Sequence, residues 1–177
     1  MPLFDVSALL EEDEATKGLD IPFRFGKSFD VNITLKDGKW QKTDSAEVWS
    51  LTITSDDAYS LNFIFSELYI PEGGEMYIFN EAGSMVYGPV TNKQNDHGET
   101  FMTDIISGES VVIQILISLK SKEKPMFTIQ NIIHGYKDVF GENGTEAYGG
   151  SSDCVRNKDI TYYPFYVVIQ ILFLVIC

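Results

Sequence analysis

The chain has 177 residues, of which 44% are hydrophobic, including 12 Phe and 9 Tyr. This composition excludes a disordered class and suits one domain, since a domain of about 150 residues buries about 70% of the surface that its unfolded chain exposes. The formal net charge of −13 argues against nucleic acid and against an anionic membrane surface as partners, because affinity for both comes mainly from Lys and Arg. We interpret the acidic surface as a solubility device.

The first 20 residues predict a short helix and lack the features of a signal peptide. In "SALLEEDEATKG", Ser7 is the expected N-cap and Gly18 the expected stop. Residues 11–14 would then lie near the first turns, where acidic charge suits the helix dipole. The functional alternative is an acidic site for cations or a basic partner, and we favour a solvated face. A signal peptide is not expected, because the basic start is absent and the apolar stretch is short.

From Pro22 onward the sequence alternates apolar and polar residues, which is typical of half-buried β-strands. Residues 29–35, "FDVNITL", form the first such run, and "KDGK" after it predicts a hairpin-type turn. The next two runs are 47–55 and 60–70. Their expected core-facing residues are Trp49, Leu51, Ile53, Leu61, Phe63 and Phe65.

The second half of the domain continues this pattern. Residues 76–90 predict a β-hairpin around "NEAG" that ends at Gly88-Pro89. After "TFMTDI", residues 108–119 form the strongest strand, and its nearly continuous apolar run predicts cover on both faces. Residues 126–136 form the last strand, with an irregularity after Ile129. About eight strands and hardly any helix predict an all-β, β-sandwich or jelly-roll-like domain over residues 21–140.

Few residues carry chemistry of their own. His97 and His134 have neither metal-binding spacing nor a cysteine partner within the domain, and Ser110 does not lie in a nucleophile elbow. We therefore predict no catalytic, cofactor-binding or metal-binding residues. The carboxylates of "SDDAYS" and "NKQNDHGE" could bind a hard cation, although turn formation is the commoner role of such residues.

Four aromatic residues allow two interpretations. Trp49, Tyr69, Tyr77 and Tyr87 could form a platform for a sugar or a peptide. Alternating positions on strands more often place such rings in the core.

The composition changes after residue 140. Residues 141–153 are rich in Gly and Ser and predict a linker, and residues 154–177 end in an apolar run. Residues 165–177 are too short to cross a bilayer core of about 30 Å, which needs roughly twenty residues. We therefore do not expect a membrane partner, despite the apolar tail.

Several segments together resemble a known family. The segments are "DIPFRFGKSFDVNITLKDGKWQ", "VWSLTITSDDAYSLNFIFSELYIPEGGEMYIFNEAGSMVYGP", "ISGESVVIQI" and "IQNIIHGYKDVFG". They resemble the N-terminal pro-region of secreted bacterial trypsin-like serine proteases of the lysyl endopeptidase type. The shared elements are R-F-G, W-x-L, A-x-S-L-N, Y-x-P-E-G, I-x-N and H-G-Y-x-D, which follow one another in order over residues 1–140.

The resemblance also bears on the tail. In this family a Gly/Ser linker leads to a protease domain that opens with a Cys, and "GGSSDCVRN" is similar to that opening. It implies that Cys154 corresponds to the first disulfide cysteine, with its partner and the catalytic triad farther downstream. After Asn157 the sequence departs from the family. We interpret the tail as truncated or frameshifted coding sequence, the alternative being a segment that inserts into a membrane or a partner.

If the tail is such a remnant, Cys154 should be unpaired and the tail should dock poorly. A disulfide to Cys177 would require a Cα separation of about 4.4–6.8 Å, and nothing in the run favours that approach. Burial of Ile169, Leu172 and Val175 against the domain would contradict this interpretation.

The resemblance implies a function without chemistry. It suggests the non-catalytic pro-region of a secreted serine endopeptidase, which acts as a folding aid or inhibitor of a protease domain joined to it in the full precursor. No cofactor is expected, and the sequence does not specify an oligomeric state. The alternative is a secreted β-sandwich binding module that recognises polysaccharide or protein through exposed aromatic residues.

Overall fold

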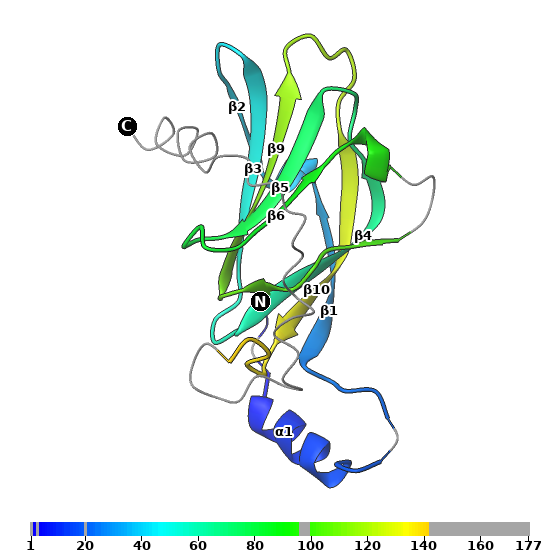
Figure 1. Ribbon diagram of the computed structural model, residues 1–177, viewed down its shortest axis with the longest axis vertical. Coiled ribbons are helices and arrows are strands. Elements are labelled where there is room, and N and C mark those ends of the chain that lie inside the picture. The colour runs from blue at the N-terminus through cyan, green and yellow to red at the C-terminus, as the bar shows by residue number, and fades with distance from the viewer. Residues whose placement is uncertain (1, 3, 20, 96–99, 142–177) are drawn as a thin grey trace.

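Two antiparallel five-stranded sheets form the body of the protein (Figure 1). The computed structural model describes residues 2, 4–19, 21–95 and 100–141. The first sheet contains β1 (Gly26–Thr34), β10 (Met126–Gly135), β4 (Ser60–Tyr69) and β7 (Phe101–Met102) in this order, with β8 (Ile106–Ser107) also paired to β4. The second contains β2 (Lys39–Lys42), β3 (Ala46–Thr54), β9 (Ser110–Ser118), β5 (Gly74–Asn80) and β6 (Val86–Val90) in this order. The predicted all-β sandwich is confirmed, with the short strands β2 and β8 in addition to the expected ones.

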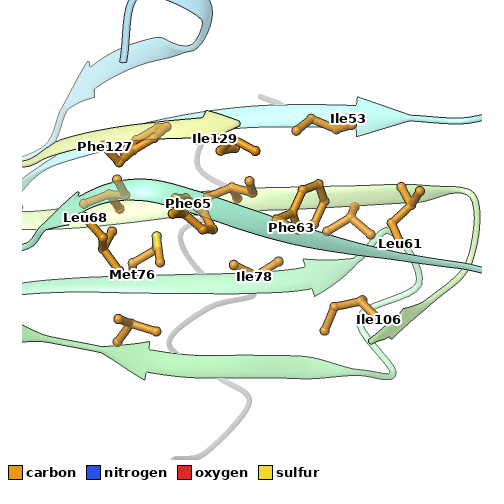
Figure 2. Packing of buried hydrophobic residues seen from close by; sticks show 14 of the residues in the cluster. Ile53, Leu61, Phe63, Phe65, Leu68, Met76, Ile78, Ile106, Phe127 and Ile129 are labelled. Atoms are coloured by element: carbon orange, nitrogen blue, oxygen red, sulfur yellow. The ribbon is translucent and has the colours of Figure 1, made fainter. Parts of the chain in front are cut away.

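The core lies between the two sheets and is filled by the rows of residues that the alternation pattern selected. Leu61, Phe63 and Phe65 of β4 are fully buried, and Trp49 of β3 faces them from the other sheet. Figure 2 shows Phe63, Phe65 and Ile78 among the side chains that fill this layer. Burial of each such side chain contributes roughly 1.5–3 kcal/mol, which explains why strand periodicity alone sets which face turns inward.

β9 is the centre of the second sheet, between β3 and β5. Its residues Val111, Ile113, Ile115 and Ile117 are buried in the core. On the opposite face Gln114 is buried, while Val112 and Leu116 are only half-buried. The prediction of cover on both faces is therefore correct for the core face and only partly correct for the other.

The "KDGK" segment does not form a hairpin turn, because the strands that it joins belong to different sheets. A short 3-10 helix at Leu35–Asp37 carries the chain across the edge of the sandwich. The indole nitrogen of Trp49 donates a hydrogen bond of 2.9 Å to the carbonyl of Leu35. A Cβ on Gly38 would lie only 2.3 Å from ring atoms of Trp49. The crossing is thus held in place by Trp49 of β3, which lies outside the four-residue segment from which a turn is predicted.

The N-terminal helix α1 spans Val6–Ala15 and lies beyond one end of the sandwich (Figure 1). Its N-cap is Asp5, which accepts a hydrogen bond of 3.2 Å from the amide of Ala8, so the assignment of Ser7 as the cap was wrong. The last helical residue is Ala15 and the C-cap is Thr16, two residues before Gly18. Residues 11–14 consequently lie in its second half, where acidic charge opposes the helix dipole instead of suiting it.

The hairpin of β5 and β6 and the irregularity in β10 are confirmed. β6 continues through Gly88-Pro89 to Val90, however, so this dipeptide does not end the strand. In β10 the register with β4 shifts on both sides of Ile129. The interpretations of the linker beyond Gly141 and of the apolar tail lie outside the described residues.

Candidate functional sites

Four side chains join α1 to the end of β10, and we call them the Asp13 cluster: Asp13, Arg24, Tyr136 and Lys137. One carboxylate oxygen of Asp13 accepts a hydrogen bond of 2.8 Å from Nε of Arg24. The other accepts a hydrogen bond of 2.8 Å from the hydroxyl of Tyr136 and lies 2.7 Å from Nζ of Lys137. No residue of α1 is fully buried, and these polar contacts join the helix directly to the sandwich.

The charges of the Asp13 cluster change the acidity of its members. Partial burial alone would raise the pKa of Asp13, but the hydrogen bonds and charges of Lys137, Tyr136 and Arg24 outweigh it and lower that pKa from 3.8 to about 2. Burial, together with the hydrogen bond to Asp13, raises the pKa of Tyr136 to about 12. The carboxylate therefore stays ionised, and the phenol stays protonated, at any physiological pH.

A buried serine–histidine pair lies at the same end of the sandwich. The hydroxyl of Ser55 and Nδ1 of His134 share a hydrogen bond of 2.8 Å, and each residue is only 2% exposed. The ring of Phe4 packs edge-on against His134 at 4.8 Å between centroids. Burial lowers the pKa of His134, and the carboxylates of Asp57 and Glu109 offset this only in part.

Serine and histidine at this distance are the pair that a nucleophilic hydrolase uses. Here neither side chain is accessible to a substrate, and Nε2 of His134 has no hydrogen-bond partner within the described part of the chain. We therefore interpret the pair as structural: it joins the end of β3 to the end of β10.

A groove of about 440 Å³ opens at the edge of the second sheet and is called the Trp40 groove. It is lined by Leu35, Trp40, Gln41, Lys42, Glu47 and Lys124. The ammonium group of Lys124 forms an ion pair with Glu47 and lies 5.2 Å from the centre of the Trp40 ring. Trp40 is 40% exposed, which makes this the most accessible aromatic surface next to positive charge in the second sheet.

The four aromatic residues considered from the sequence do not form a platform. Trp49 is fully buried, and Tyr87 packs against the core. Tyr69 and Tyr77 are half-buried, on β4 and β5, which belong to different sheets. The interpretation as core residues is therefore correct for Trp49, in part for Tyr87, and not for Tyr69 and Tyr77. The exposed tryptophan is Trp40, which the pattern did not single out.

The "SDDAYS" segment forms a turn at residues 56–57. Asp57 has a positive φ of 61°, and its amide donates a hydrogen bond of 3.1 Å to the side chain of Glu109. Within residues 2, 4–19, 21–95 and 100–141 no group of three or more His, Cys, Asp or Glu side chains is arranged to hold a metal ion. His97, the second half of "NKQNDHGE" and Cys154 lie outside these ranges.

The residues of the family resemblance occupy defined places in the fold. The R-F-G and H-G-Y-x-D elements meet on adjacent strands, where Gly26 is paired with Gly135. The amide of Tyr136 donates a hydrogen bond of 3.0 Å to the carbonyl of Phe25. A Cβ on Gly135 would lie 2.2 Å from the hydroxyl oxygen of Ser60, so the strands can approach this closely only with glycine.

The other elements of the resemblance also have structural roles. The W-x-L element contributes Trp49 and the A-x-S-L-N element contributes Leu61, both of which are fully buried in the core. The asparagine of I-x-N is Asn80, which accepts a hydrogen bond of 3.1 Å from the amide of Met85 and donates one of 2.9 Å to Ser84. These contacts close the turn between β5 and β6.

A comparison with models of protein families finds none that matches this chain. Among the described residues there is no helix long and apolar enough to cross a bilayer.

Proposed function

We propose that this chain is the non-catalytic pro-region of a secreted serine endopeptidase of the lysyl endopeptidase type, and that it assists the folding of the protease domain or inhibits it. The support is the ordered set of motif elements, together with the way in which they cooperate. The first and last elements, R-F-G and H-G-Y-x-D, come from opposite ends of the domain and pair through Gly26 and Gly135.

A domain of this kind can act without chemistry of its own. A preformed sandwich that binds the native protease more strongly than its unfolded chain stabilises the native form by mass action. The same contact, placed over a substrate cleft, inhibits. The buried state of Ser55 and His134 agrees with a role that depends on surface binding.

The experiment uses purified residues 1–150 and a mature protease of the resembled type. We expect the domain either to raise the refolding yield of the denatured protease or to slow its cleavage after Lys. A matched control is the Phe63→Asp variant, which places a charge in the fully buried core and should abolish both effects by preventing folding. No effect of the folded domain on either quantity would contradict the proposal, and so would hydrolysis after Lys or Arg by the domain itself.

The second candidate function, a secreted binding module for polysaccharide or protein, is supported by one feature, the Trp40 groove. An exposed aromatic ring beside lysine side chains is a surface on which ligands commonly bind. Retention of the protein on immobilised ligands, and its loss in the Trp40→Ala variant, would favour this candidate over the first.

A further inference from the structure

The edge of the second sheet next to the Trp40 groove is open. β2 is an edge strand of the sheet β2–β3–β9–β5–β6, and within the described residues it pairs only with β3. All four residues of Lys39–Lys42 are exposed. An edge strand of this kind presents main-chain donors and acceptors to which an extended segment can add as a further strand.

The charge at this edge is opposite to that of the whole chain. Lys36, Lys39 and Lys42 lie on or beside β2, and the acidic residues Asp37 and Asp44 flank the same stretch. Of these lysines only Lys42 lines the groove, together with Lys124. The nearby carboxylate of Glu47 is paired with Lys124. The chain as a whole has a net charge of −13, but this edge is locally basic. Charge complementarity therefore favours a negatively charged partner here.

The groove also offers apolar contact. Trp40 is directly opposite Trp49 in the register of β2 and β3, so both side chains project from the same face of the sheet. Leu35 and Trp40 supply the apolar part of the lining, and the volume of about 440 Å³ is large enough for a side chain of the bound segment. A segment in which acidic and apolar residues alternate would fit both the charge and the groove.

We propose that the Trp40 groove and the free edge of β2 together bind an extended acidic peptide segment, which adds to the second sheet as a strand. The main chain of the segment pairs with Lys39–Lys42. Because side chains alternate between the two faces of a strand, its apolar side chains lie on the face of Trp40 and enter the groove, and its carboxylates lie on the face of Lys39. This inference concerns the ligand of the binding-module candidate and is independent of the pro-region proposal, because its test contains no protease.

The structure favours a peptide over an acidic polysaccharide for two reasons. The ammonium group of Lys124 already lies 5.2 Å from the centre of the Trp40 ring, so it occupies one of the faces on which a sugar would stack. The open edge of β2 matches the donor and acceptor spacing of a peptide main chain, which a sugar does not reproduce.

Tryptophan fluorescence can follow binding to the full chain directly. The protein has 2 Trp, and Trp49 is fully buried, so a change in emission on addition of ligand reports mainly on Trp40. The probe is a short synthetic peptide in which Glu alternates with Val. We expect a saturable change that weakens with added salt, because exposed charges are screened.

Variants and matched peptides separate the outcomes. The double variant Lys39→Glu, Lys42→Glu should bind the Glu/Val peptide roughly tenfold or more weakly, because two attractive charges become repulsive. The control Lys17→Glu changes an exposed charge in the turn after α1 and should bind as the wild type does. A peptide with Pro at its centre should bind less well, because Pro removes a ladder hydrogen bond.

Four results would each overturn the proposal. They are the absence of saturable binding, unchanged affinity in the double variant, equal binding of a Lys/Val peptide, and tighter binding of polygalacturonate than of the Glu/Val peptide. The last of these would assign the site to an acidic polysaccharide.

Discussion

Replacement of Asp13 by Asn tests whether polar contacts, and not apolar packing, hold α1 against the sandwich. The substitution keeps the size of the side chain but removes its charge. The amide oxygen can still accept from Tyr136 and Lys137, which both contact one oxygen of Asp13, but the amide NH₂ group then replaces the oxygen that accepts from Nε of Arg24 and places a donor against a donor. Arg24 also loses its ionic partner, although Glu12 remains at 3.0 Å.

The magnitude follows from the acidity of Asp13. The difference between its ordinary pKa of 3.8 and a pKa of about 2 in the folded protein corresponds to at most about 2.4 kcal/mol. The side chain of Asp13 is 16% exposed and that of Arg24 is 40% exposed, so solvent screening reduces this to about 1–2 kcal/mol. The stabilisation is present above the unfolded pKa of 3.8 and is lost as the pH falls through about 2.

Hydrogen exchange of the α1 amides at neutral pH is the appropriate assay, because loss of the cluster can release the helix without unfolding the sheets. We expect exchange in Asp13→Asn to be about 5–30 times faster over Val6–Ala15, and unchanged in β4 and β9. The control is Glu14→Gln on the same helix, which removes only an exposed ion pair with Lys17 and should have no measurable effect. Equal protection of α1 in Asp13→Asn and in the wild type would refute the reasoning.

Two further predictions concern the ends of the sandwich. Because burial lowers the pKa of His134, the unfolded chain takes up a proton below about pH 6.5 while the folded protein resists it, and the free energy of unfolding should decrease as the pH falls from neutrality towards 5. Urea denaturation of His134→Asn should show a clearly smaller decrease over this range; an identical pH dependence would exclude His134 as the cause. The Gly38→Ala variant should lose about 1–3 kcal/mol of stability, because its methyl group would lie 2.3 Å from the ring of the fully buried Trp49. Urea denaturation with Lys36→Ala as the exposed control checks this, and equal midpoints for the two variants would contradict the steric explanation.

Strand periodicity predicted the core correctly because the alternation of apolar and polar residues within one strand already decides which of its faces is buried. Leu61, Phe63 and Phe65 alternate with Asn62 and Ile64, and the apolar row that they form is buried. Which strand pairs with which is different, since it depends on contacts between distant segments. The prediction of a hairpin turn at "KDGK" was wrong for this reason: the chain crosses to the other sheet there, and Trp49 of β3 donates a hydrogen bond to the carbonyl of Leu35 at the crossing.

The candidate sites were harder to predict from the sequence than the fold was. Asp13 belongs to a run of four acidic residues that are equivalent by composition, and its partners Tyr136 and Lys137 are near the other end of the domain. The N-cap illustrates the same limit at short range: Asp5 and Ser7 are both good capping residues, and only the geometry selects Asp5. For Trp40 a signal was available, because a tryptophan in the polar stretch "KWQK" has no apolar partners at alternate positions and is therefore expected to be exposed.

The positions of the motif residues show that the resemblance concerns the fold and does not concern ligand binding at the Trp40 groove. The motif residues have structural roles: they pack the core, close turns or bring strands together, as Gly26, Gly135, Trp49, Leu61 and Asn80 do. A sequence that shares them is therefore expected to share this fold. None of them lines the Trp40 groove. A chain could therefore keep every motif residue and still differ in its ligand. The refolding assay therefore tests whether a domain with this fold and these motif residues also acts as a pro-region. The peptide titration tests the Trp40 groove, a surface that the motif residues do not line. Failure of one leaves the other intact.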